Sequence, residues 1–306
     1  MRKKLLVACV VGMMCLGLTG CKSSDYKEAV TFQEAGDYSL ALTIYDSLGD
    51  YKDSVDRGSE CQSYITAIDS YNSAKDAAKA LNESLDTEVT KAEQLVTSED
   101  LALDETLRPS LETAISETKA AKKDIPEMPA TLEEINEVNK EITAIDYSDA
   151  LANLDKLYQA LDTSIQQYAL VNHPSEGYII DCLGQVANVV DISAVTEDND
   201  PNEKLNKAGG YTAQVYFSSE LVNQGDVSGS TVIEKGTDCG GSIEVYTTPE
   251  DAQKRNDYLA AFDGGIFASG SHTVIGTVLV RTSDKLKASE QKEMEANIIT
   301  VLTTLQ

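Results

Sequence analysis

The chain has 306 residues, of which 51 are acidic and 25 are lysine or arginine, so its formal net charge is −26 at pH 7. A chain this acidic repels phosphate groups and anionic lipid headgroups, which argues against nucleic acid as a partner. The length is sufficient for two domains. The sequence contains no recognised nucleophile, metal or phosphate-binding motif, so no residue is assigned a catalytic role.

The first 21 residues have the three parts of an export signal in order. The basic segment Arg2–Lys4 precedes an apolar run, Leu5–Leu18, which is too short to span a bilayer comfortably. The run ends at Leu18-Thr19-Gly20-Cys21, which resembles a lipobox, the processing site of bacterial lipoprotein precursors. The resemblance implies that residues 1–20 are removed as a signal peptide and that Cys21 carries lipid. The alternatives are an ordinary secretory signal and an uncleaved anchor helix.

The remaining sequence divides into three parts by composition. Residues 21–25 are expected to form a short lipidated tether. Residues 26–171 have helical apolar spacing, whereas most glycines and β-branched runs fall in residues 172–306. We therefore predict a multidomain protein, with an all-α helical bundle or stalk followed by a small α+β domain. His173-Pro174-Ser175 marks the predicted boundary, because proline disfavours helix in the preceding residue.

The helical part opens with a short repeat. Gly36-Asp37-Tyr38 recurs as Gly49-Asp50-Tyr51, with glycine suited to a helix end and aspartate to a helix start. The stretch Gly36–Tyr45 resembles the second helix of a tetratricopeptide (TPR) repeat. The resemblance implies a TPR-like helical hairpin over residues 26–60. Since solenoids need several repeats, we interpret the single unit as a cap on the helices that follow.

Those helices are predicted from apolar residues spaced three, four or seven apart between Tyr64 and Tyr168. Such spacing is typical of a helical bundle or coiled coil. Pro126 and Pro129 interrupt the pattern, and Asp146-Tyr147-Ser148 is a second candidate break. A three-helix bundle accommodates this pattern.

The α+β part mixes strands and helices without a regular βαβ order. Apolar and polar residues alternate in Tyr211–Ser218, which predicts a half-buried strand. Thr248-Pro249 predicts the start of a helix that runs to about Ala261. The other predicted strands are Val189–Thr196, Thr231–Glu234, Ile243–Thr247 and Ser271–Thr282, and the other predicted helices are Glu176–Gln185 and Lys287 or Ser289 to Leu305.

Four stretches of this part also carry a family resemblance: Ala194–Asn202, Gly209–Ala213, Gly236–Gly241 and Phe267–His272. They resemble the C-terminal domain of surface lipoproteins of Firmicute-type bacteria. The resemblance implies an envelope location and an α+β architecture, and it implies no activity.

The cysteines expected in the mature chain include two in the α+β part. In an oxidising compartment these residues, Cys182 and Cys239, are predicted to form a disulfide. The alternative is that both are buried as small apolar side chains.

The acidic segment Glu197–Glu203 is the candidate ligand loop. Asp198, Asp200 and Asn202 place oxygen atoms at alternate positions, which is half the spacing of a calcium loop. Calcium is the one cofactor that the sequence suggests here, and a solvated acidic turn is the alternative. Long loops rich in acids or glycine tend to carry function. The candidate binding-loop residues are Glu197, Asp198, Asp200, Gly264, Gly265, Ser269 and Ser271.

Together these features favour an extracytoplasmic protein that the lipid on Cys21 anchors to the membrane of the cell envelope. We expect a non-enzymatic binding or presentation role towards an unidentified envelope or extracellular partner. Two alternatives stay open. One is an envelope glycan hydrolase that uses carboxylates of residues 172–306. The other is a scaffold for envelope assembly that docks through the TPR-like hairpin.

Overall fold

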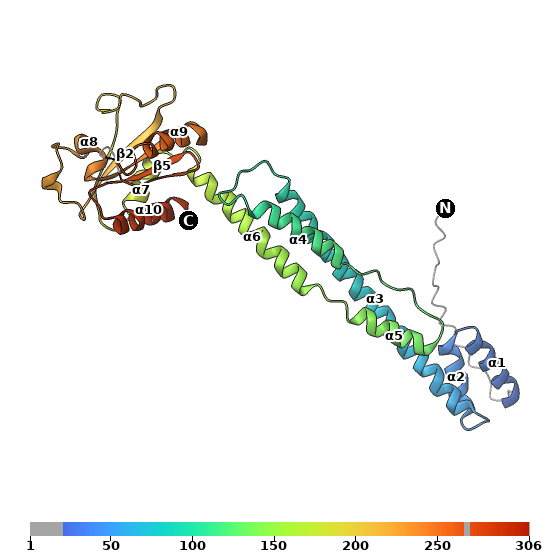
Figure 1. The fold of residues 1–306 in the computed structure, drawn as a ribbon. Helices are drawn as coiled ribbons and strands as arrows, with labels where there is room; N and C mark the ends of the chain where they lie inside the picture. Colours follow the sequence, from blue (N-terminus) through green and yellow to red (C-terminus); the bar gives the residue numbers. More distant parts are fainter. Residues whose placement is uncertain (1–20, 266–269, 306) are drawn as a thin grey trace. The chain divides into compact units, whose positions relative to one another are not determined.

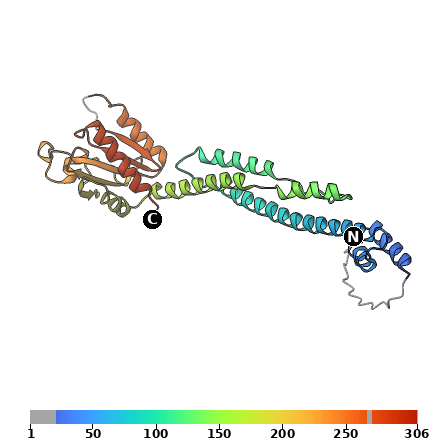
Figure 2. The same cartoon turned by 90° about the horizontal axis from the view of Figure 1, so that it is seen from below.

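The computed structural model describes residues 21–265 and 270–305, and two views of its ribbon are shown in Figures 1 and 2. An N-terminal helical region precedes a five-stranded antiparallel sheet with helices, which confirms the predicted fold class. One compact unit contains the described residues up to Asp86 and Ala121–Ser148, and the other contains Thr87–Ala120 and the residues from Asp149 onward. None of the helices in the described ranges combines the length and the apolar composition that a membrane span requires.

A helical hairpin forms in the place predicted for it. Helices α1 (Lys22–Glu34) and α2 (Tyr38–Leu48) pack through a small core that includes Ala29 and Tyr45. The predicted tether is wrong, because α1 begins at Lys22 and the Ser24 amide donates to the Cys21 carbonyl at 2.6 Å. Residues 22–25 are therefore the first turn of a helix.

Four helices follow where three were predicted: α3 (Ser54–Val96), α4 (Leu107–Ala121), α5 (Leu132–Thr143) and α6 (Ser148–Val171). In the first unit, Tyr71 on α3 donates to the Pro126 carbonyl at 2.8 Å, and this contact holds the proline-containing segment that separates α4 from α5. The Asp146 carboxylate accepts a hydrogen bond from the Ser148 amide at 2.9 Å and so separates α5 from α6. Both predicted breaks are confirmed.

The sheet has the order β1-β2-β3-β5-β4, and every neighbouring pair is antiparallel. Its first face is covered by α7 and α10, which pack on Val215, Ile243 and Val280. Its second face is covered by α9, which contributes Ala252 and Leu259 (Figure 1). The bounds are β1 Val189–Ala194, β2 Tyr211–Ser219, β3 Gly240–Tyr246, β4 His272–Ile275, β5 Val278–Thr282, α7 Glu176–Leu183, α9 Pro249–Ala260 and α10 Ala288–Thr303.

Three strand predictions are corrected. Strand β2 is buried on both faces rather than half-buried, because Tyr211 and Tyr216 pack with Val195 and Leu205 in the apolar cluster of the second face. The segment Thr231–Glu234 is not a strand, since its threonine and glutamate form the capping box of the short helix α8 (Val232–Lys235). The single long strand predicted over Ser271–Thr282 is a hairpin of β4 and β5, with Gly276 at φ 57° in the turn.

We expect Gly241→Val to lower the free energy of unfolding by about 3 kcal/mol, because any side chain at position 241 would clash with its neighbours. A Cβ atom there would lie 2.3 Å from the Phe217 ring and 2.3 Å from the Arg281 carbonyl oxygen. Gly177→Ala is the matched control, since a Cβ on that residue of α7 meets open space. The control should be neutral or slightly stabilising. Urea unfolding followed by circular dichroism tests both, and equal stability of Gly241→Val and the wild type would contradict the packing.

Candidate functional site

A buried ion network lies between the sheet and α9. The Glu244 carboxylate, at the centre of β3, is fully buried. The Arg281 Nη1 atom on β5 lies 2.9 Å from its Oε1 atom, and the Arg255 Nε atom on α9 lies 3.4 Å from its Oε2 atom. One carboxylate thus connects two strands and the helix that covers them.

Strand alternation explains why these charges meet. Ser242, Glu244 and Tyr246 share one face of β3, because successive side chains of a strand point to opposite faces. In the β3–β5 register Ser242 is opposite Arg281, and Glu244 is opposite Leu279. Glu244 and Arg281 are therefore diagonal neighbours on the face that α9 covers.

Neutral side chains complete the network. The Tyr246 hydroxyl donates to Glu244 Oε2 at 2.6 Å, and the Gln214 amide donates to the Tyr216 hydroxyl at 3.0 Å. Burial, and then the negative charge of Glu244, raise the pKa of Tyr246 and of Tyr216. Both phenols are therefore neutral at physiological pH. A buried ion pair costs stability unless its hydrogen bonds are satisfied, and the Tyr246 hydroxyl supplies one of them.

A hollow of about 380 Å³ lies beside this network, and we call it the Arg255 hollow. The buried residues Tyr211 and Tyr246 line it, and their rings pack edge to face with centroids 6.4 Å apart. Three cationic residues, Lys204, Lys254 and Arg255, also line it. Its remaining lining residues are Asn202, Gly209, Gly210 and Asp251. The size is that of a small-molecule site.

Arg255 is the best-oriented cation of the hollow. Glu244 holds its Nε side, the Tyr258 ring lies 5.4 Å from its Cζ atom, and 27 % of its side chain is exposed. Across residues 21–265 and 270–305, its two terminal nitrogens donate no hydrogen bond. Arg255 lines the hollow, and its terminal nitrogens keep their donors available to a ligand there.

Asp200 organises the loop that forms the other wall. Its carboxylate accepts hydrogen bonds from the amides of Asn202, Lys204 and Leu205 at 2.6 to 2.9 Å, and from the Tyr211 hydroxyl. Burial alone would raise the pKa of Asp200, but the hydrogen bonds from Tyr211 and from these amides outweigh it and lower the pKa. Asp200 is therefore an internal acceptor that fixes the loop in its turn.

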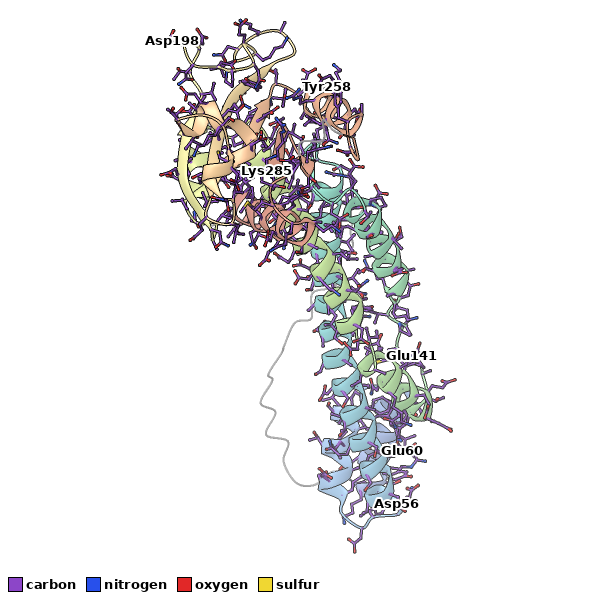
Figure 3. The ribbon with its side chains drawn as sticks, turned by 60° about the vertical axis from the view of Figure 1, so that its left-hand side comes forward. Asp56, Glu60, Glu141, Asp198, Tyr258 and Lys285 are labelled. Carbon is purple, nitrogen blue, oxygen red and sulfur yellow. The ribbon has the colours of Figure 1, made fainter. Side chains whose placement is uncertain are left out.

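This geometry does not bring the candidate calcium ligands together. The Asp200 oxygens face the protein's own donors, and the Asn202 amide nitrogen lies 3.3 Å from the Tyr211 hydroxyl. Asp198 is exposed on the loop after β1, as Figure 3 shows. In the part of the chain that the structure describes, no three His, Cys, Asp or Glu residues form a group that could hold a metal ion.

The other predicted loop residues have separate roles. The Glu197 carboxylate accepts from the Asn206 amide at 3.1 Å, and Gly264 and Gly265 are exposed beyond the end of α9. The Ser271 hydroxyl donates to Glu295 on α10. Ser269 lies outside the described residues. Among the described residues of this set, Glu197, Gly264, Gly265 and Ser271 do not line the Arg255 hollow.

The predicted Cys182–Cys239 disulfide is corrected, because both thiols are free and buried. Cys182 on α7 faces the Val301 carbonyl of α10 at 3.6 Å, whereas Cys239 donates to the Gly236 carbonyl at 3.1 Å. Burial raises the pKa of Cys239 to about 11, so the thiol is protonated. Cys21 is exposed at the start of α1, and its lipidation stays a prediction because residues 1–20 lie outside the described residues.

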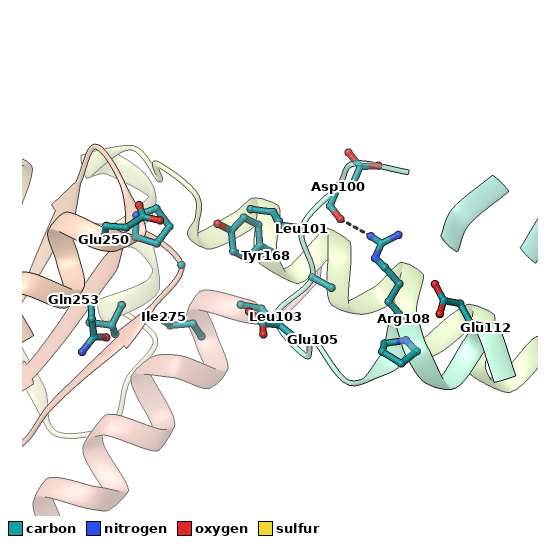
Figure 4. A pocket seen from close by; sticks show the side chains of 15 residues that line it. Asp100, Leu101, Leu103, Glu105, Arg108, Glu112, Tyr168, Glu250, Gln253 and Ile275 are labelled. Carbon is teal, nitrogen blue, oxygen red and sulfur yellow. Dashed lines mark hydrogen bonds between the residues drawn. The ribbon is translucent and has the colours of Figure 1, made fainter. Parts of the chain in front are cut away.

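A second hollow, of about 780 Å³, lies in the same compact unit and is drawn in Figure 4. Leu101, Leu103, Tyr168 and Ile275 give it an apolar lining. Its arginine, Arg108, donates to the carbonyls of the last two residues of α3 and of Asp100. Arg108 therefore satisfies the end of a helix, which is a structural role.

Sequence reasoning missed Glu244, Arg255 and Arg281. A signal was present, because Glu244 and Arg281 are single opposite charges inside apolar strand-forming runs, Ile243–Tyr246 and Val278–Thr282. A charge in such a run is buried only with a partner. The pairing itself required the strand order and register.

Comparison of the chain with protein-family models, curated proteins and solved structures finds no match.

We expect Asp200→Asn to lower the free energy of unfolding at pH 7 by about 2 kcal/mol, because amides donate more strongly to a carboxylate than to a neutral oxygen. In the wild type this stabilisation is complete above the ordinary pKa of 3.8 and is lost as the pH falls through the lower folded value. Asp200→Asn should therefore lose less stability than the wild type between about pH 5 and pH 2.

The matched control is Asp198→Asn, two residues away on the same loop, whose carboxylate makes no hydrogen bond or ion pair with any described residue. It should unfold as the wild type does at every pH. Urea unfolding at a series of pH values measures both variants. Equal effects of the two substitutions would mean that Asp200 does not organise the loop.

Proposed function

We propose that the protein is a lipid-anchored binding protein of the cell envelope, and that it recognises a small molecule in the Arg255 hollow. The orientation of Arg255 carries this proposal. A buried carboxylate lies 3.4 Å from the Nε atom of Arg255, and the residue lines a hollow together with two tyrosines. Preformed hollows with a few converging polar groups are typical of ligand sites.

The same contacts favour binding over catalysis. Both oxygens of Glu244 are engaged, one by Arg281 and the other by Tyr246 and Arg255. This carboxylate therefore positions a binding group and is not placed to exchange a proton with a substrate. The glycan hydrolase and the scaffold that docks through residues 26–60 stay alternatives, and no specific contact favours either.

The anchor is supported by the sequence and by the start of the first helix. The basic segment, the apolar run and the lipobox-like residues stand in order before Cys21. Cys21 is exposed and immediately precedes α1, so its thiol is accessible for acylation. Two or more acyl chains give stable membrane attachment. The acidic protein surface does not itself favour binding to a membrane with anionic lipids.

We expect Cys21→Ala to abolish lipid attachment, since the thioether requires a thiol. The variant should appear in the medium or remain unprocessed, whereas Cys61→Ala, which removes a buried cysteine of the helical region, should stay in the membrane fraction. Fractionation and mass spectrometry of the N-terminus measure this. A mature N-terminus at another residue, or an unmodified Cys21, would contradict the anchor.

The binding site is tested without assuming the ligand's charge. We expect at least one component of an envelope extract, fractionated into neutral, cationic and anionic pools, to protect the hollow from hydrogen–deuterium exchange. Protection should fall on peptides that contain residues 202–211 and 246–255 of the full-length chain in detergent. Peptides from α4 serve as the internal control. If no pool protects these peptides, the hollow is not the binding site.

A further inference from the structure

The Arg255 hollow has a charge opposite to that of the chain. Three cationic side chains line it and one acidic side chain, Asp251, accompanies them. Asp251 pairs with Lys254 at 2.9 Å, while Arg255 pairs with Glu244 beneath the hollow, and Glu244 is also paired with Arg281. The ammonium group of Lys204 forms no ion pair with any residue in the described ranges. The Asp200 carboxylate, which accepts from the Lys204 amide and the Tyr211 hydroxyl, adds a further negative charge at the wall. The cationic groups still outnumber the acidic ones around the hollow, in a chain with a net charge of −26.

The donors of the hollow fit an oxyanion. A guanidinium fork matches the planar pair of oxygens in a carboxylate, or two oxygens of a phosphate, with two parallel hydrogen bonds. Lys204 and Lys254 line the same hollow as point charges that need no particular geometry. The hydroxyl groups of Tyr211 and Tyr246 are engaged by Asp200 and Glu244, so these residues offer mainly the faces and edges of their rings.

We propose that the hollow binds the carboxylate or phosphate group of a small molecule, with Arg255 as the oriented donor and Lys204 and Lys254 as supporting charges. This inference rests on the proposed binding function and names the class of its ligand. The volume of the hollow also limits which anions can bind. A small anion fits a hollow of about 380 Å³, whereas a nucleic acid or an anionic membrane is repelled by the net charge of −26 that the chain carries.

Isothermal titration calorimetry of the full-length chain in detergent tests the inference with three probes. Citrate represents carboxylates, inorganic pyrophosphate represents phosphates, and glucose is the uncharged control. We expect citrate or pyrophosphate to bind and glucose not to bind. The probe that binds more tightly shows whether the hollow prefers a carboxylate or a phosphate group. Failure of both anions to bind would overturn the inference.

Variants locate the binding. The double substitution Lys204→Gln and Lys254→Gln changes two exposed side chains. It should lower the affinity for the anion at least tenfold without altering the thermal unfolding curve. Arg255→Lys keeps the charge and loses the fork, and it should also weaken binding about tenfold. Lys292→Gln, on the exposed surface of α10, is the matched control and should bind as the wild type does.

Equal binding by the double variant and the control would mean that the anion binds elsewhere, and it would overturn the inference. This failure is distinguishable from failure of the proposed function. If only the neutral or cationic pool of the envelope extract protects residues 202–211 and 246–255 from exchange, the hollow is a binding site and its ligand is not an anion. If no pool protects them, both proposals fail.

Discussion

The α+β part depends on the burial of one carboxylate. A fully buried Glu244 without partners would be strongly destabilising, so the groups around it must be in place in the folded protein. Arg281 arrives from β5 and Arg255 from α9, and these contacts fix the helix over the sheet. The position of α9 in turn sets one wall of the Arg255 hollow. The stability of the network and the shape of the hollow are consequences of the same interaction.

The opposite wall depends on a second acid used in the same way. The Asp200 carboxylate accepts hydrogen bonds from three backbone amides and from the Tyr211 hydroxyl. These bonds hold the loop before β2 in a defined turn. Tyr211 then packs against Tyr246, whose hydroxyl donates to Glu244. The two carboxylates are thereby linked through a pair of aromatic rings. Most other acids of the chain are exposed, and Asp56, Glu60 and Glu141 in Figure 3 are examples on helices.

Local features were predictable from the sequence and nonlocal ones were not. The helices were found because the 3.6-residue period, the prolines and caps such as Thr248 act within a few residues of one another. The strand over Ser271–Thr282 was predicted as one piece because β-branched residues continue across the Gly276 turn. The site was missed because Glu244 and Arg281 are 37 residues apart and meet only through the β3–β5 register.

A chain with many more acidic than basic residues can still contain a cationic hollow, because solvent and salt screen the charges of exposed side chains. At physiological salt the field of exposed carboxylates falls off over about 8 Å, so an exposed acid farther than that from the hollow has little effect inside it. There the nearest charges decide the potential, and the cations Lys204, Lys254 and Arg255 outnumber the acids Asp251 and Asp200. A large polyanion would contact many exposed acids at once and be repelled by them. Such a surface therefore disfavours large anions while leaving the hollow able to attract small ones.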